Sequence, residues 1–314
     1  MSRASLILAL TALVALALLP FYAGEYFINL ASQILIAAIF ASSLNLLVGY
    51  GGLTSLGHAA FVGVSAYVFA WLTTHAGAGP AVAAAAALVG ATIVACVFGL
   101  VALRATGLGF LMITLAFSQI LWGLAYRWAS VTNGDNGISG IPRFSPFGLS
   151  LDGAAAFYWF TLALCVIAFA AIAAFASSAF GAALRGTRDE PRRMAALGHD
   201  VRLIRWITFV YAGFWAGVAG LLYVNYNKFI HPSAMSITNS AEGLLAVIAG
   251  GSGTLAGPIV GATLIMLLKN YVSAYVERWN MLLGFVFVAI VLIAPDGVIP
   301  GLRRAAARIR GGRK

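Results

Sequence analysis

The sequence predicts an all-α protein, built as a polytopic bundle of membrane-spanning helices. Hydrophobic residues make up 62% of the 314 residues and charged residues only 9%, whereas soluble domains carry about 25% charged residues because their surfaces face water. The apolar residues gather in long runs, and crossing a bilayer takes about 20 residues. Basic residues lie in short clusters between these runs, as membrane topology requires.

Nine apolar runs are candidate spanning helices, and we expect them to form one transmembrane domain over residues 1–314. They cover residues 5–21, 28–48, 53–74, 80–103, 107–127, 156–178, 203–225, 257–274 and 279–294. The first run has the length of a signal peptide, with Arg3 as its basic region. No small-residue cleavage site follows it, so we expect a retained helix.

A further apolar segment, at about 240–250, is too short to span a membrane alone. It runs into a cluster of helix-breaking residues: Gly250, Gly251, Gly253, Gly257 and Pro258. Glycine and proline this close together disfavour a continuous helix. We therefore expect one short or broken helix at 240–258, which is tolerated at membrane depth only where protein or a cavity surrounds it.

The distribution of basic residues orients the chain. We place Arg3, the loop at Arg104, a coupling loop at 182–203 and a basic tail at 303–314 in the cytoplasm, which satisfies the positive-inside rule. The basic residues left on or near the other side are Arg127, Arg143, Lys228, Lys269 and Arg278. The tail returns to the cytoplasm only if 240–258 completes a crossing. The sequence therefore predicts about ten passes, with both termini cytoplasmic.

The longest external loop, 129–155, is rich in turn-forming residues. It is either a solvated connector or a docking surface for an external partner.

Several classes of function are disfavoured. The net charge of +10 comes without a basic face interleaved with aromatic residues, so we expect no nucleic-acid partner. Cys96 and Cys165 lie inside apolar runs, where we expect small buried hydrophobic residues and not a disulfide. The four histidines are scattered, and no nucleophile or paired acids stand out. We expect no metal, no cofactor and no enzymatic activity.

The cytoplasmic coupling loop contains the sequence of a short helix. In order, it has a basic residue, an acidic pair, a proline, two alanines and a glycine: Arg188, Asp189, Glu190, Pro191, Ala195, Ala196 and Gly198. Acidic residues and proline favour a helix start, and glycine favours its end. We expect a helix of one or two turns outside the membrane. Either this loop only determines the membrane topology, or its helix is bound and moved by a soluble motor protein.

Polar residues inside the spans are candidates for a translocation path, because polar groups in hydrocarbon are costly and usually face a bundle interior. Asn45 lies near the end of its span, and Ser55 and His58 follow on the next one. Their spacing of three predicts that Ser55 and His58 share one helical face. These residues either line a path or connect helices through hydrogen bonds.

Glu242 is the strongest single candidate for a residue of the translocation path. It lies at the start of the short segment before the glycine cluster. It either caps a half-helix at the outer surface, or faces a substrate chamber and meets the ammonium group of a zwitterion. Lys269 lies near the outer end of its span, where we expect its side chain to snorkel to the interface.

The coupling loop resembles the ATPase-contacting loop of ABC importer permeases, which has an acidic pair, small residues and then a glycine. More widely, the chain resembles the branched-chain amino-acid ABC permease family, its LivM-like subunits in particular. Further stretches carry the likeness in the family's order: 43–61, 136–142, Glu242 with 250–258, and 295–297. Together they run from about residue 28 to residue 304.

The resemblance implies partners and a location. It implies a heterodimer with a related second permease subunit, two cytoplasmic ABC ATPases and an external, periplasmic substrate-binding protein, all at a bacterial inner membrane. The chain itself has no G-x-x-x-x-G-K-[ST] phosphate loop, so another chain must handle ATP. The implied cargo is branched-chain or related small amino acids, and urea or amides are the alternative within the family.

Two other transport mechanisms compete with this one. An ion- or proton-coupled secondary transporter tends to place Asp, Glu or His in the membrane as coupling sites, and His58 is the plausible mid-span residue of that kind. A channel works with few charges. A channel does not need a cytoplasmic helix that a motor protein binds and moves, so the loop at 182–203 discriminates between these mechanisms.

Overall fold

The computed structural model describes residues 3–145 and 151–272, with residues 281, 284–285, 288, 292 and 297–301. Over these residues the chain is mostly helical, as the sequence predicts. A small exception to the all-α class is the pair of strands β1 (Ile138–Ser139) and β2 (Phe229–Ile230), which pair antiparallel. The tail at 303–314 and most of the run at 279–294 lie outside the described residues.

Two sets of helices build the bundle. The long ones are α1 (Arg3–Tyr22), α2 (Glu25–Asn45), α4 (Pro80–Ala102), α5 (Leu108–Arg127), α7 (Ala154–Ser177) and α10 (Val201–Asn227). The shorter ones are α3 (Ala59–Thr74), α6 (Ala129–Thr132), α8 (Ala179–Asp189), α9 (Pro191–Ala196), α11 (Ile237–Gly250) and α12 (Gly257–Val272). A π-helical turn, η1 (Leu46–Tyr50), extends α2, and the 3-10 turns are η2 (Gly134–Asn136) and η4 (Pro232–Met235). Among described residues, α2 with η1, α4, α5, α7 and α10 are long and apolar enough to cross a membrane.

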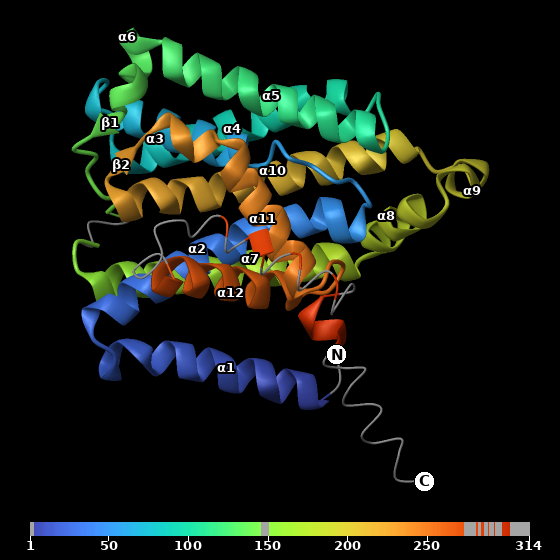
Figure 1. Ribbon diagram of the computed structural model, residues 1–314, viewed down its shortest axis with the longest axis horizontal. Helices are drawn as coiled ribbons and strands as arrows, with labels where there is room; N and C mark the ends of the chain where they lie inside the picture. Colours follow the sequence, from blue (N-terminus) through green and yellow to red (C-terminus); the bar gives the residue numbers. More distant parts are fainter. Residues whose placement is uncertain are drawn as a thin grey trace.

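The long helices run side by side between two ends of the molecule (Figure 1). One end carries β1, β2 and α6, and we call it the strand end. The other carries α8 and α9, and we call it the α9 end. Helix α1 begins towards the α9 end, and the α4–α5 connection also lies there. The chain therefore passes back and forth between two chemically different ends.

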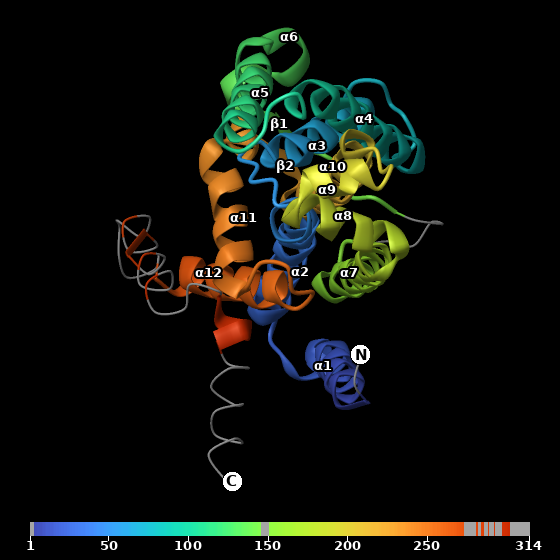
Figure 2. The same cartoon turned by 90° about the vertical axis from the view of Figure 1, so that its right-hand side faces the viewer.

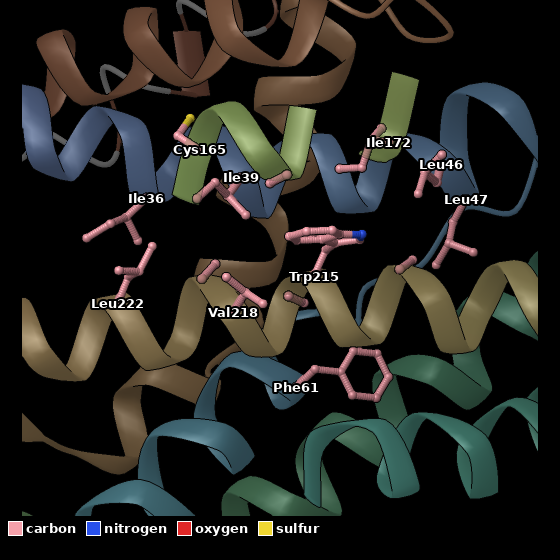
Figure 3. Close-up of a cluster of buried hydrophobic side chains, with 14 of the residues drawn as sticks. Ile36, Ile39, Leu46, Leu47, Phe61, Cys165, Ile172, Trp215, Val218 and Leu222 are labelled. Atoms are coloured by element: carbon pink, nitrogen blue, oxygen red, sulfur yellow. The ribbon is translucent and has the colours of Figure 1, made fainter. Parts of the chain in front are cut away.

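The core lies where α2, α7 and α10 meet. Trp215, Val218 and Leu222 of α10 lie three and four residues apart, so one helical face carries all three. They pack towards Ile36 and Ile39 of α2 (Figure 3). This apolar face fixes α2 and α10 at the centre of the bundle, with α1 at its edge (Figure 2).

The run predicted to span at 53–74 is helical only from Ala59, and residues 51–58 are irregular. Distant protein groups support this segment: Leu56 N donates to Thr114 Oγ1 at 3.3 Å, and Ala59 N, directly after the segment, donates to Ser240 Oγ at 3.1 Å. Such support is what non-helical backbone needs at membrane depth. The prediction that Ser55 and His58 share a helical face is therefore wrong, because both precede α3.

The short helix expected at 240–258 is α11, and the chain turns after it. Helix α11 ends at Gly250 and α12 begins at Gly257. Gly251 and Gly253 have φ of +114° and +75°, which favour glycine. A Cβ on Gly261 would collide with the carbonyl oxygen of Ala246, so α11 and α12 pack in close backbone contact. Figure 2 shows α11 crossing from α5 to α12.

Candidate functional site

A cavity of about 300 Å³ lies among α2, α3, α10, α11 and α12. Most of its wall is apolar, including Ile36, Phe40, Val62 and Ile265. From α10 the lining residues lie in the last turns, up to Asn227, and from α12 they run from Ala262 to Lys269. The cavity therefore lies in the half of the bundle towards the strand end.

An ion pair lies in the wall of this cavity. Lys269 Nζ of α12 lies 3.1 Å from Glu242 Oε2 and 3.2 Å from Glu242 Oε1 of α11. The side chain of Glu242 is only 12% exposed and that of Lys269 is 36% exposed. The cavity therefore has a negative and a positive group side by side in an otherwise mostly apolar wall.

The contacts of these two residues differ from two of the expectations for them. Ser236 caps α11, since its Oγ accepts from Asn239 N at 3.3 Å, and Glu242 is the sixth residue of that helix. Glu242 therefore does not cap the half-helix. Lys269 pairs with Glu242 across the α11–α12 contact, where snorkelling to the interface was expected.

His58 and Ser55 are not among the residues that line the cavity. His58 is fully buried, with Nε2 2.9 Å from Ser43 Oγ and its ring between those of Phe40 and Phe61. Ser55 Oγ accepts from Gly57 N at 3.3 Å. His58 thus holds the irregular segment 51–58 against α2, and Ser55 stabilises the turn within that segment. Of the four path candidates, Glu242 is the one that lines the described cavity.

Asn45 connects α2 to the turn between α11 and α12. Its Oδ1 accepts from Gly253 N at 2.9 Å, and its Nδ2 donates to Thr254 O at 2.9 Å. The side chain is 2% exposed. Asn45 thus joins the end of α2 to the glycine-rich break, although the two are 208 residues apart in sequence.

The coupling loop contains two helices where one was expected. Helix α9 begins at Pro191, as predicted, and Gly198 follows it with φ of +87°. The preceding residues belong to α8, which ends at Asp189 and which sequence reasoning missed. Its signal was Ser178, an N-cap whose Oγ accepts from Gly181 N at 3.2 Å.

Helix α9 is exposed at its end of the molecule. Ala195, Ala196 and Gly198 are all exposed, as are Asp189 and Glu190. Leu197 directly after the helix is 68% exposed and lies next to charged residues in the sequence. The α8–α9 segment therefore offers a surface with both apolar and charged groups.

Arg188 of α8 links this segment to the bundle. Its Nη1 donates to Gly49 O of η1 at 2.6 Å, and its Nε lies 3.0 Å from Asp189 Oδ1. Its aliphatic stem covers Gly52, where a Cβ would collide with it. Gly49 in turn lies directly against Gly253 and Asn45. A continuous set of contacts thus runs from α8 through η1 to the break between α11 and α12.

The loop at 129–155 is organised against α10 over its described residues. β1 pairs with β2, which follows α10. Arg143 Nε donates to Asn225 O at 3.2 Å, and its Nη1 donates to Leu151 O at 2.8 Å. This part of the loop is therefore more than a loose connector. Residues 146–150 lie outside the described residues.

Known proteins resemble this chain in sequence. The model of the family described as "Branched-chain amino acid transport system / permease component" matches residues 26–293. The high-affinity branched-chain amino acid transport system permease protein LivM of Escherichia coli K12 is 27% identical over 97% of this chain and 77% of its own length.

More distant relatives are similar over shorter stretches. The high-affinity branched-chain amino acid transport system permease protein LivH of E. coli K12 is 23% identical over 49% of each chain. The probable branched-chain amino acid transport permease protein LivM of Methanocaldococcus jannaschii is 24% identical over 46% of each chain. No solved structure matches at a comparable level. Because the family model spans most of its length, this protein belongs to the permease family of branched-chain amino acid transport systems.

Proposed function

We propose that the chain is a permease subunit of an ABC importer, forming half of the path for branched-chain or related small amino acids. A related second permease supplies the other half of a heterodimer. Two cytoplasmic ATPases power it, and an external binding protein delivers the solute. The observation that carries this proposal is the exposed helix α9, connected through Arg188 to η1 and the α11–α12 turn.

Movement of α9 would reach the path through short, direct contacts. Arg188 is fixed to Gly49, and Asn45 is fixed to the turn at 251–256. That turn joins α11 and α12, which both line the cavity. A displaced α8 would therefore shift the two helices that carry Glu242 and Lys269. Hinges of this kind are usually a few residues at the ends of helices.

The same proposal places the α9 end in the cytoplasm and the strand end outside, across a bacterial inner membrane. Arg185, Arg188, Arg192, Arg193 and Arg202 gather in and around α8 and α9, which suits the positive-inside rule. Helices α1 to α5, α7 and α10 to α12 then give nine crossings, α11 being the short one. The apolar run at 279–294 supplies a tenth, and the tail at 303–314 returns to the cytoplasm.

Co-purification tests the ATPase partner. The full-length chain, purified from its own membranes, should bring down a cytoplasmic ATPase. Ala195→Trp on exposed α9 should abolish this retention, since a bulky ring there obstructs a docked partner. Ser139→Trp, exposed at the strand end, should retain the ATPase and is the matched control. A wild-type chain that brings down no ATPase contradicts the proposal.

Arg188→Gln separates coupling from docking. The ATPase should stay bound and hydrolyse ATP, while uptake should fall about tenfold, the cost of one hydrogen bond to a charged group. Arg185→Gln is the control: it lies one turn earlier on α8, but its Nη1 donates to Ala176 O at 2.6 Å, away from η1. Equal loss of uptake in both variants would argue against the contact route. Uptake driven by a proton gradient without ATP would favour a secondary transporter.

A further inference from the structure

The Glu242–Lys269 ion pair is a poor source of stability where it lies. Taking two charges out of water is costly, and apolar residues of similar volume in place of a buried pair often leave stability unchanged or raised. The pair lies in the wall of a cavity, with Glu242 only 12% exposed. Ionisable groups inside a membrane bundle usually serve substrates or ions. Binding is therefore a better account of this pair than folding.

The charges restrict what the cavity accepts. A lone cation could pair with Glu242 but would leave Lys269 facing a like charge, and a lone anion would do the reverse. An uncharged solute would have to displace the ion pair without replacing either partner. A solute with both an ammonium and a carboxylate keeps both charged groups paired. The two protein charges lie 3.1 Å apart, so a short zwitterion bridges them.

The rest of the cavity wall determines which kind of side chain the solute can have. Ile36, Phe40, Val62 and Ile265 form an apolar wall beside the ion pair. The volume of about 300 Å³ is at the lower end of the range for small-molecule pockets. A compact aliphatic group fits such a wall, and a charged or strongly polar one would lose its hydration there.

We propose that this cavity, inside a single permease subunit, binds a small apolar α-amino acid as its zwitterion. The ammonium group pairs with the Glu242 carboxylate, and the carboxylate pairs with the Lys269 ammonium. One internal ion pair is exchanged for two ion pairs with the solute. The inference rests on the proposed function, and what it adds is the site: the two residues of one subunit that hold the charged ends of the solute.

Direct binding to the purified permease–ATPase complex, without the binding protein, tests this site. Radiolabelled leucine should bind saturably at millimolar concentration or below. Two analogues each lack one charge: 3-methylbutylamine has no carboxylate, and 4-methylpentanoate has no ammonium. Each should compete roughly 100-fold more weakly or worse, because the solute then offers no opposite charge to one of the two protein groups. Analogues that compete as well as leucine, or no saturable binding, would overturn the proposal.

A double variant separates binding from folding. Glu242→Gln with Lys269→Met removes both charges together and leaves neither unpaired. The complex should assemble, melt near the wild-type temperature and hydrolyse ATP, yet lose leucine binding and uptake. Lys228→Met, which removes an exposed lysine paired with Asp152 at 3.6 Å, is the control and should bind normally.

The same variant keeps the two proposals distinguishable. If it binds and transports leucine like the wild type, the zwitterion site is refuted, while the retained ATPase and ATP-driven uptake still support the importer. If no ATPase assembles with the wild-type chain, the importer itself fails.

Discussion

Asn45 shows how one side chain can hold two distant segments. An amide offers a donor and an acceptor in one plane, so it can satisfy an N–H and a carbonyl of the same turn. Asn45 does so for Gly253 and Thr254. The sequence indicated Asn45 as a polar residue in the bundle interior. Its task is to hold the break closed against α2, and it does not line the cavity.

Asn45→Ala should destabilise the protein. The change leaves the N–H of Gly253 and the carbonyl of Thr254 without this partner, and an unsatisfied buried group costs about 1–3 kcal/mol. The midpoint of thermal unfolding should fall, and uptake should fall with it. Asn270→Ala is the control, because Asn270 Nδ2 donates only within α12, to Met266 O at 2.9 Å. A loss of stability in Asn270→Ala as large as in Asn45→Ala would contradict this account.

The candidate site could be predicted only in part from the sequence. Glu242 stood out because a carboxylate in an apolar segment is rare. Its pairing with Lys269 was missed, since it depends on how α11 folds back onto α12. His58 attracted attention for the same reason as Glu242, but its ring lies between two phenylalanine rings and bonds Ser43. Residue type alone does not separate these two environments.

The α11–α12 hairpin is the element on which the cavity depends. The two helices approach so closely that Gly250 lies against Gly257 O, and Gly261 lies against Ala246 O. Small residues permit this approach between helices in a membrane. The close packing fixes the relative position of Glu242 and Lys269, one on each helix.

Gly261→Ala should separate these helices. The added methyl group meets backbone at Ala246, which cannot rotate away as a side chain could. Overpacking of this kind typically costs about 1–3 kcal/mol. Gly123→Ala in α5 is the matched control, with nothing within 4 Å of the added Cβ. It should be neutral, or stabilising by up to about 1 kcal/mol through helix propensity.

Thermal unfolding of both purified variants checks this prediction. Leucine binding should fall in Gly261→Ala and not in Gly123→Ala. A Gly261→Ala protein that melts at the wild-type temperature would show that α11 and α12 can separate at little cost.

The long apolar helices and the break at 250–258 were predicted well, but the irregular segment 51–58 was not. The bounds of α4, α5, α7 and α10 lie within two residues of those expected, because length and composition define them. The start of α3 was placed too early, since 51–58 is apolar enough to resemble a helix. Its partners, Thr114 and Ser240, come from distant parts of the chain. Non-local hydrogen bonds of this kind leave no local pattern.

At the scale of the whole molecule, the two ends differ in chemistry. At the strand end, β1 in the 129–145 segment pairs with β2. Asp135 lies next to His231 there, and Asp152 next to Lys228. The α9 end carries a cluster of arginines on short exposed helices. This asymmetry suits a protein that meets one partner outside and another in the cytoplasm.

Cysteine labelling tests the orientation and the number of passes together. In a background with Cys96 and Cys165 replaced by Ala, single cysteines are introduced as Ser139→Cys, Leu197→Cys and Lys314→Cys. Ser139 and Leu197 are exposed, at the strand end and the α9 end respectively. A membrane-impermeant maleimide applied to intact cells should label only the cysteine at 139, and disrupted membranes should allow labelling at all three.

Each position answers a separate question. Labelling at 197 from outside would mean that the protein has the opposite orientation in the membrane. Helix α9 would then be out of reach of a cytoplasmic ATPase. Labelling at 314 from outside, with 139 also outside, would mean an odd number of passes, so that either α11 with its turn or the run at 279–294 fails to cross. With nine crossings from α1 to α12, an even total requires that last run to span. Protection at both 197 and 314 would therefore support ten passes and place α9 and the basic tail on the same side.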